Sequence, residues 1–497
     1  MEQAHFDNTV VVGDATWARD VQRKCVREAT AALQIIETRI TQNKGLSGGG
    51  VMLGRGGIAL CYLHLDACFS DLPPYTPENE ILVENAPQFS PSSCVQQAQV
   101  HLAAAEKMMA SKQLRASFLE GLPGVLAIRA TCHSRSGHTD RAVAAVRELE
   151  QLYDAIDQQL APGECEVLYG RSGYLWSLCA VEDMVGSGTV NRELVTRVAS
   201  RVIATGLQNA GAAGSEGARF GLWYEWHGKA YLGAAHGLCG ILSTLLFAHT
   251  VFGTEALGVT PQQFADIVHR ALRALLDERY ASGNLPSSHG SRTDRLVQWC
   301  HGAPGLMMLL AQALPFVKRS LESPSPGCPA VPEQEIRDAL AAASEVVWQR
   351  GLLRKGCGLC HGIAGNAYAF LAAFRATSDP TYLHRATAFA SFMADSWREL
   401  ADVPDRPFSL YEGLAGAVCL WFDMLRPLSA NMPGFEADAS PTRYSVDSTK
   451  RGSGCGNRSS QRVSLDEAAP NGKASSPTGG LLSRNLAKDL PKVPLLP

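Results

Sequence analysis

Seven copies of a Gly-x-x-Gly motif recur along the chain, and each opens an apolar segment of helical length. The first glycines of successive copies stand 67, 49, 67, 65, 60 and 51 residues apart. A repeat unit of this kind cannot bury its apolar face alone, so the copies must pack against one another. The motifs occupy residues 54–57, 121–124, 170–173, 237–240, 302–305, 362–365 and 413–416.

Stretches between the apolar segments carry charges on one face, as amphipathic outer helices do. A pair of one buried and one amphipathic helix cannot hide its apolar surface, whereas closing the pairs into a ring places the apolar helices inside. The sequence therefore predicts an all-α toroid. The clearest outer stretches are 139–159, 260–280 with Pro261 in the first turn, 333–350 and 379–400.

The paired glycines predict a close approach of backbones at the narrow end of the ring, with helix N-termini whose free N–H groups face a central cavity. The alternative is that the glycines only ease tight turns. Segments 70–93 and 318–332 are rich in Pro and Ser and predict surface loops. Because the apolar periodicity stops near residue 438, we expect a toroid domain at 1–437 and a disordered, Ser/Gly/Pro-rich tail at 438–497.

The overall composition excludes several classes of protein. A net charge of -3 leaves no electrostatic footprint for nucleic acid. No apolar run reaches the roughly eighteen residues of a membrane helix, so we predict no transmembrane segment. The chain has 14 cysteines and an N-terminus unlike a signal peptide, which predicts reduced thiols and a cytoplasmic location. We expect a monomer.

The two residues before each first glycine form one register, and in a closed ring this register becomes one rim. Cys-His occupies it twice, as Cys300-His301 and Cys360-His361. Thiolates and imidazoles are the ligands that zinc takes, so the rim predicts a zinc site. The alternative is that the cysteines only pack. The residues by themselves do not choose between His301 and His361.

Longer strings around these motifs resemble the LanC-like proteins, eukaryotic relatives of the bacterial lanthionine synthetases. The resemblance extends from about Gly54 to about Glu436 and includes all seven repeats. The strings that carry it are YEWHGKAYLGAAHGLCGI, DRLVQWCHGAPGL, KGCGLCHGIAGNAYAFL and RPFSLYEGLAGAV.

The resemblance implies an α/α toroid of seven inner and seven outer helices with one zinc. It selects Cys300, Cys360 and His361 as the ligands, which leaves one coordination position open, as in catalytic zinc sites. It also implies a glutathione-binding protein that adds the glutathione thiol to dehydroalanine or dehydrobutyrine in proteins, in some substrates after phosphate elimination. His236 matches the family's active-site histidine and is our candidate general acid or base, with His301 as a second candidate.

Glutathione carboxylates and substrate phosphate require cations near the metal. Lys355 matches the family's lysine at this place. A second cation of animal members aligns with Asp402 here, so Arg406 is the candidate for that role. Cys357 also replaces a residue that is usually aromatic; it is a candidate extra ligand or redox group, although simple packing is the preferred interpretation.

Two other functions remain open at this stage. The protein could be a non-catalytic zinc- and glutathione-binding regulator or scaffold, in which the change at Asp402 reflects a lost activity. A glycosidase-like toroid would use paired carboxylates, for which Glu120 and Glu412 in the rim register are the candidates. The glycosidase hypothesis leaves Cys300 and Cys360 unexplained.

Overall fold

Each Gly-x-x-Gly motif marks the start of an inner helix in the computed structural model, which describes residues 4–9, 13–42, 45–72, 76–110, 115–322 and 330–436. The first glycine is the N-cap in all seven copies, and the second is the third residue of the helix. The inner helices are α2 (Arg55–Asp71), α5 (Leu122–Arg135), α8 (Arg171–Val185), α11 (Leu238–Phe252), α13 (Ala303–Leu321), α15 (Ile363–Thr377) and α17 (Leu414–Asp423).

The second glycine of each motif is required by a lack of space. A Cβ atom at any of these seven positions would lie at most 2.5 Å from the carbonyl oxygen six residues earlier. At six of them it would also lie within 3 Å of a side chain from the preceding repeat, as at Gly124 against Val51. The predicted close approach of backbones is therefore confirmed.

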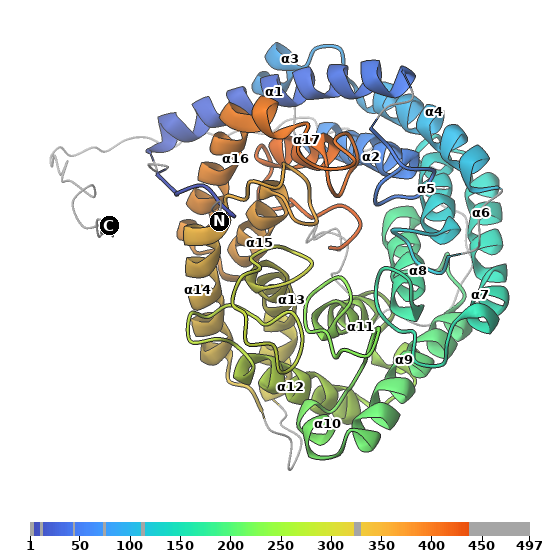
Figure 1. Ribbon diagram of the computed structural model, residues 1–497. Helices are drawn as coiled ribbons and strands as arrows, with labels where there is room; N and C mark the ends of the chain where they lie inside the picture. The colour runs from blue at the N-terminus through green and yellow to red at the C-terminus, as the bar shows by residue number, and fades with distance from the viewer. Residues whose placement is uncertain are drawn as a thin grey trace, which may run out of the picture. The chain divides into compact units, whose positions relative to one another are not determined.

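Seven outer helices surround the inner ones (Figure 1). Three of the four predicted outer stretches form single helices. The stretch 139–159 is interrupted at Leu152 and continues as α7 (Tyr153–Gln159). The outer helices are α1 (Ala15–Thr41), α4 (Pro91–Met109), α6 (Thr139–Gln151), α9 (Arg192–Ala212), α12 (Pro261–Asp277), α14 (Glu333–Arg350) and α16 (Pro380–Leu400).

Three short helices complete the described structure: α3 (Pro77–Asn85), α10 (Gly214–Phe220) and the 3₁₀ helix η1 (Thr254–Leu257). The prediction of a loop at 70–93 was wrong where α3 lies and at both ends, because α2 continues to Asp71 and α4 begins at Pro91. Thr76 caps α3, Pro77 occupies its first turn, and Ile81 and Leu82 are buried. The predicted loop at 318–332 was also wrong at its start, because α13 continues to Leu321.

The ring is closed by elements from both ends of the chain. Successive inner helices contact one another from α2 to α17, and α17 contacts α2. The outer partner of α17 is α1, which also packs against α16. Figure 1 shows α1 beside α16 and α17 on the same side of the ring. The predicted toroid of seven inner and seven outer helices is thus confirmed.

The rim of the ring is linked by backbone hydrogen bonds between equivalent residues of neighbouring repeats. We call this series the rim ladder. Each N–H donates to the carbonyl oxygen of the next repeat, and the N···O distances range from 2.7 to 3.5 Å. The ladder runs from Ala235 to Cys300, Cys360, Tyr411, Met52 and Leu119.

In six of the seven inner helices the N–H of the first residue already has a hydrogen-bond acceptor, so that part of the glycine prediction was wrong there. The N–H of Arg55 donates to Gly48 O at 3.0 Å, and the N–H of Leu414 donates to Pro407 O at 2.8 Å. The same seven-residue spacing recurs before α8, α11 and α15. These loops consume the donors that would otherwise attract an anion.

The chain segment after α17 returns to the interior of the ring. Met432 and Phe435 are buried there, and the backbone oxygen of Phe435 accepts a hydrogen bond from Trp176 Nε1 at 3.3 Å. The hydroxyl of Tyr411 donates to Pro433 O at 3.0 Å. This segment therefore occupies part of the ring interior behind the rim.

None of the described helices combines the length and the apolar character needed to cross a membrane. The predicted tail at 438–497 lies outside the described residues.

Candidate metal centre

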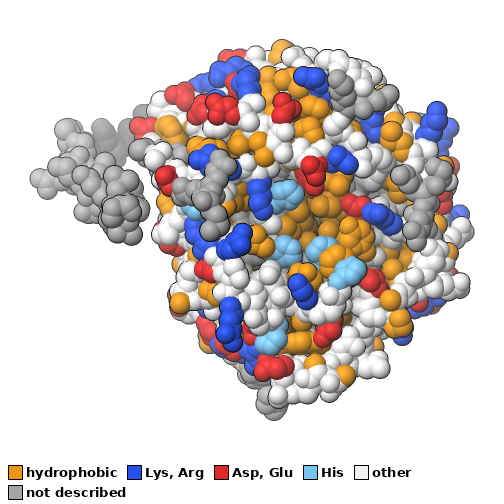
Figure 2. Space-filling view, in the orientation of Figure 1, with side chains coloured by type: hydrophobic (Ala, Val, Ile, Leu, Met, Phe, Trp, Pro, Cys, Tyr) orange, Lys and Arg blue, Asp and Glu red, His pale blue; other side chains and the backbone are white. Residues whose placement is uncertain are grey.

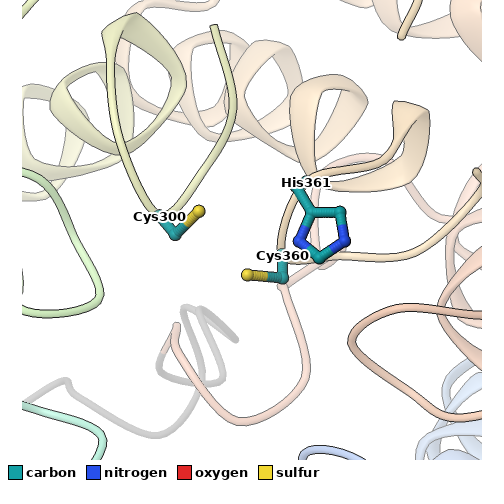
Figure 3. A group of neighbouring side chains, drawn as sticks. All are labelled: Cys300, Cys360 and His361. Atoms are coloured by element: carbon teal, nitrogen blue, oxygen red, sulfur yellow. The ribbon is translucent and has the colours of Figure 1, made fainter. Parts of the chain in front are cut away.

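The three candidate zinc ligands converge on one point of the rim. Cys300 precedes α13, whereas Cys360 and His361 precede α15, the next inner helix around the ring. One ligand atom from each of the three lies within 4.8 Å of the others. Figure 3 shows the two sulfur atoms turned toward each other from neighbouring loops, with the imidazole of His361 beside them. A backbone bond from Cys300 N to Cys360 O at 3.3 Å, part of the rim ladder, fixes the spacing of the loops.

The donor set fits zinc. Zn–S bonds of about 2.3 Å and Zn–N bonds of about 2.0–2.1 Å keep ligands of one tetrahedral ion within about 4 Å of each other, so only a small adjustment is needed. Both cysteines are nearly buried, at 6% and 5% exposure. Three protein ligands would leave a fourth coordination position open.

The two thiols hydrogen-bond to each other, which shifts their pKa values in opposite directions. A hydrogen bond from Cys360 lowers the pKa of the Cys300 thiol well below its ordinary value, against the effect of burial. The same bond, together with burial, raises the pKa of Cys360. A divalent cation would remove this competition, because it stabilises both thiolates.

Gln298 connects the metal centre to Lys355. Its Oε1 accepts a hydrogen bond from Lys355 Nζ at 3.1 Å, and its Nε2 donates to Cys300 Sγ at 3.2 Å. Because an ammonium group only donates, it fixes which end of the amide faces the lysine and turns the NH₂ group toward the sulfur. Sequence analysis missed this residue.

The two candidate catalytic histidines lie side by side next to the metal centre. The ring centroids of His236 and His301 are 6.1 Å apart, and Tyr231 contacts both rings. Burial lowers the pKa of His301, and Lys355 and His236 act in the same direction while Cys300 opposes them. His301 therefore favours the neutral imidazole.

His236 is held by groups that sequence analysis did not identify. Its Nδ1 is 2.8 Å from Oε2 of the buried Glu166, which also accepts the backbone N–H groups of Leu168 and Tyr169. The indole of Trp226 stacks on the imidazole with centroids 3.9 Å apart and planes 4° from parallel. The orientation of the ring leaves Nε2 as the nitrogen available to a substrate.

A signal for two of these missed residues exists in the repeat itself. Glu166 and Gln298 both stand four residues before a first glycine. At the same position, Ser117 and Ser409 accept the N–H groups of Glu120 and Glu412 at 3.1 and 3.2 Å. Side chains at this position hydrogen-bond to rim residues. Comparing four residues before each first glycine, instead of two, would have revealed it.

The two candidate cationic residues lie on adjacent loops. Lys355 precedes α15, and the glycine after it packs near Pro404, on the loop that carries Arg406. The Arg406 side chain donates a hydrogen bond to the carbonyl oxygen of Asp405 at 2.9 Å. Asp402 is exposed.

Glu120 and Cys357 do not join the converging ligands. Glu120 forms an ion pair with Arg115, and burial raises the pKa of its carboxyl. Cys357 is buried beside the metal centre but is not one of the converging ligands. Burial raises the pKa of its thiol to about 12, so the thiol stays protonated at neutral pH. This state agrees with a packing role.

A second His, Cys and carboxylate cluster lies deep between α2 and α17. Asp423 accepts hydrogen bonds from His64 at 2.8 Å, Cys68 at 3.6 Å and Tyr368 at 2.8 Å. Arg426 Nε also donates to it at 3.1 Å. A guanidinium beside the carboxylate opposes a metal ion, so this cluster is a hydrogen-bonded connection between helices.

Comparison with known proteins agrees with the geometry of the ring. Residues 47–437 match the family model of the lanthionine synthetase C-like proteins. The chain belongs to this family. Its structure is similar to that of nisin cyclase, with a TM-score of 0.56 and 14% identity over 80% of this chain and 93% of the cyclase. At that identity the likeness shows the shared fold.

Two relatives of this family member are closer in sequence. It is 34% identical to a Danio rerio protein named glutathione S-transferase LANCL1, over 77% of this chain and 84% of the relative. It is 38% identical to the Arabidopsis thaliana LanC-like protein GCL1, over 54% of this chain and 57% of that protein.

Proposed function

We propose that this family member is a zinc-dependent transferase that adds the thiol of glutathione to dehydroalanine or dehydrobutyrine residues of proteins. The observation that carries the proposal is the convergence of Cys300, Cys360 and His361 beside His236 on one rim. The relative named a glutathione S-transferase supports the choice of thiol. Bound to the two cysteines and His361, zinc would keep the glutathione sulfur in its thiolate form at neutral pH.

Other residues of the chain would bind the substrates and transfer the proton. Lys355 lies above the metal centre, where its ammonium group can pair with a glutathione carboxylate, and Arg406 on the adjacent loop is the second candidate. The thiolate forms a bond to the β-carbon, and the electrons of the carbon–carbon double bond move to the α-carbon and its carbonyl. His236 then donates a proton from Nε2 to the α-carbon, while Glu166 holds the ring in place through its hydrogen bond to Nδ1. In phosphorylated substrates, the same histidine would remove the α-proton before phosphate leaves.

The direct test is adduct formation on a synthetic dehydroalanine peptide, followed by mass spectrometry with zinc-loaded protein and glutathione. We expect the adduct to form faster than the uncatalysed background. His236→Asn should retain zinc and lose roughly 10²-fold in rate, as general acid–base catalysis predicts. A zinc-loaded wild type that gives only background adduct would refute the enzyme and favour a non-catalytic binder.

The assignment of the metal ligands can be controlled with Cys357, which lies in the same loop as Cys360. Cys300→Ala and Cys360→Ala should each lose bound zinc in elemental analysis, because a ligand is removed. Cys357→Ala changes an equally buried cysteine outside the trio and should keep zinc. Equal zinc content in all three variants would show that the site lies elsewhere.

A further inference from the structure

The reactive groups follow one another in a fixed order around the ring. Arg406 precedes α17, Lys355 and Cys360 precede α15, Cys300 precedes α13, and His236 precedes α11; these inner helices are neighbours in that order. Figure 2 shows histidine and apolar side chains gathered near the centre of this face, with Lys and Arg side chains around them. The thiol donor, which needs cations and the metal, therefore belongs on one side of His236.

On the other side of His236 the rim opens into a cleft of about 610 Å³. Its inner wall is made by Tyr169 and Trp226, whose rings stack with centroids 5.9 Å apart. Both rings also stack on His236. The two rings thus line the cleft and contact His236, so a molecule in the cleft lies next to the reaction site.

The wall is fixed by a tight turn rather than by a loose loop. Trp226 and Lys229 exchange two backbone hydrogen bonds of 3.0 and 3.1 Å around His227 and Gly228. Both central residues have positive φ, 49° and 70°, as in a two-residue type I′ turn. A non-glycine residue rarely adopts this conformation, and here it places His227 on the cleft and keeps Trp226 flat on His236.

The lining of the cleft is mixed rather than cationic. Arg115 lies on one side but is paired with Glu120, and Glu164 adds an acidic group. Ile156 and Leu160 contribute apolar surface, and Gln159 an amide. Such a surface does not suit a second small dianion, which requires unpaired cations. It suits a polypeptide, which presents apolar side chains together with backbone amides.

We propose that this cleft binds the polypeptide segment that flanks the dehydroamino acid, an inference that rests on the proposed function. The α-carbon of the acceptor must lie beside His236 to receive its proton, while the β-carbon faces the sulfur at the metal. The chain on at least one side of the acceptor residue then leaves the site away from the metal. Past Tyr169 and Trp226, the cleft is the space into which it extends.

The test fills the cleft without touching the reactive groups. Ala161 is exposed and lines the cleft, whereas Ala155 is exposed on α7 outside it. Ala161→Trp should raise KM for a long dehydroalanine peptide by about tenfold or more. KM for glutathione, zinc content and turnover of N-acetyl-dehydroalanine amide, which is too short to reach the cleft, should not change. Ala155→Trp, the matched control, should behave as wild type.

Two results with Ala161→Trp would refute the peptide-binding role of the cleft. One is an unchanged KM for the long peptide, and the other is an equal loss of activity with the short acceptor. Binding of a fluorescent dehydroalanine peptide without glutathione separates this proposal from the proposed function. Suppose that wild type forms no adduct but binds the peptide, and that only Ala161→Trp weakens this binding. The proposed transferase function is then refuted, whereas the peptide-binding role of the cleft is supported. If neither variant changes binding, the cleft is refuted whether or not adducts form.

Discussion

Single side chains beneath the rim determine how its reactive groups are held. Glu166 orients His236, and Gln298 lies between Lys355 and Cys300. Groups that hydrogen-bond to metal ligands tune both the ligand and the metal. In the proposed metal centre, Gln298 would couple Lys355 to Cys300, so that an anion bound by the lysine would change the hydrogen bond at the Cys300 sulfur.

Gln298→Leu tests this coupling, because leucine keeps most of the volume and removes both hydrogen bonds. We expect the variant to bind metal, to show a shifted sulfur-to-metal charge-transfer band with cobalt in place of zinc, and to raise KM for glutathione several-fold. Gln312→Leu is the control, since Gln312 bonds only to Ser243 O in the described structure. Identical cobalt spectra for wild type and Gln298→Leu would contradict the coupling.

The sequence alone identified the candidate zinc ligands as rim residues because the repeat puts equivalent positions together. It did not separate His301 from His361, and that choice required the family resemblance. Glu166 and Gln298 were missed because only the two residues before each glycine were compared. Trp226 could not have been found in this way, since its contact with His236 depends on the turn at His227 and Gly228.

Among the elements, the inner helices depend on the second glycine of each motif. Gly124→Ala would place a Cβ atom on the carbonyl oxygen of Phe118 and 2.9 Å from Val51 Cγ2. We expect the free energy of unfolding to fall by roughly 1–3 kcal/mol or more, as for other overpacked sites. Urea unfolding followed by circular dichroism measures this change.

Gly211→Ala is the matched control for that substitution, with the opposite expected sign. Gly211 lies in the last turn of α9, and a Cβ there meets nothing within 4 Å. Alanine is the better helix former, so stability should rise by up to about 1 kcal/mol. Similar destabilisation by both substitutions would show that steric contact at the motif is not the cause.

Asp423 connects α2, α15 and α17 and makes the contact between them sensitive to acid. Burial would raise the pKa of its carboxyl, but His64, Arg426 and the Tyr368 hydroxyl hold that pKa below its ordinary value. A carboxyl of this kind stabilises the fold above the unfolded pKa of about 4, and the stabilisation is lost as pH falls through the folded pKa.

Asp423→Asn should therefore lower the free energy of unfolding at pH 7 by about 3–5 kcal/mol, because Arg426 loses a buried charged partner. The difference from wild type should shrink as the pH is lowered below about 4. The control is Asp71→Asn, which removes the half-exposed second carboxylate beside Arg426 and should cost about 1 kcal/mol or less. A difference that does not depend on pH would refute the electrostatic explanation.

Helix positions were predictable where start signals were strong. The stretch 333–350 coincides with α14, and Asp379 is the N-cap of α16. The break at Leu152 could not be predicted, because no proline or glycine lies there in the sequence. The helix α3 was missed because the Pro and Ser content of the whole segment obscured the local Thr76-Pro77 start signal.

At the scale of the whole molecule, α1 closes the ring. Gln22 of α1 donates to Met424 O at 2.8 Å, and Glu28 accepts from Trp397 and Arg398 of α16 at 3.0 and 2.8 Å. The glycine count predicted seven units, but it could not show that the seventh unit combines both ends of the chain. That pairing depends on contacts between segments about 400 residues apart.

Two adjacent isoleucines of α1 test this closure. Ile36 is fully buried, whereas Ile35 is 37% exposed. Ile36→Ala should lower the free energy of unfolding by about 2–5 kcal/mol, and Ile35→Ala should change it by about 0.5 kcal/mol or less. If the closed ring unfolds as one cooperative unit, the denaturant midpoints of zinc release and of the loss of helical signal should shift together. Zinc retained after the helical signal is lost would contradict a single cooperative ring.

The split seventh unit also has a consequence for how the chain is made. The helix α1 is synthesised before its partner α17, which follows more than 370 residues later, from Leu414. At about 5–20 residues per second, this interval lasts roughly 20–80 seconds. During that time α1 can contact α3 but lacks its contacts with α16 and α17, so part of its apolar face stays exposed until those two helices are synthesised.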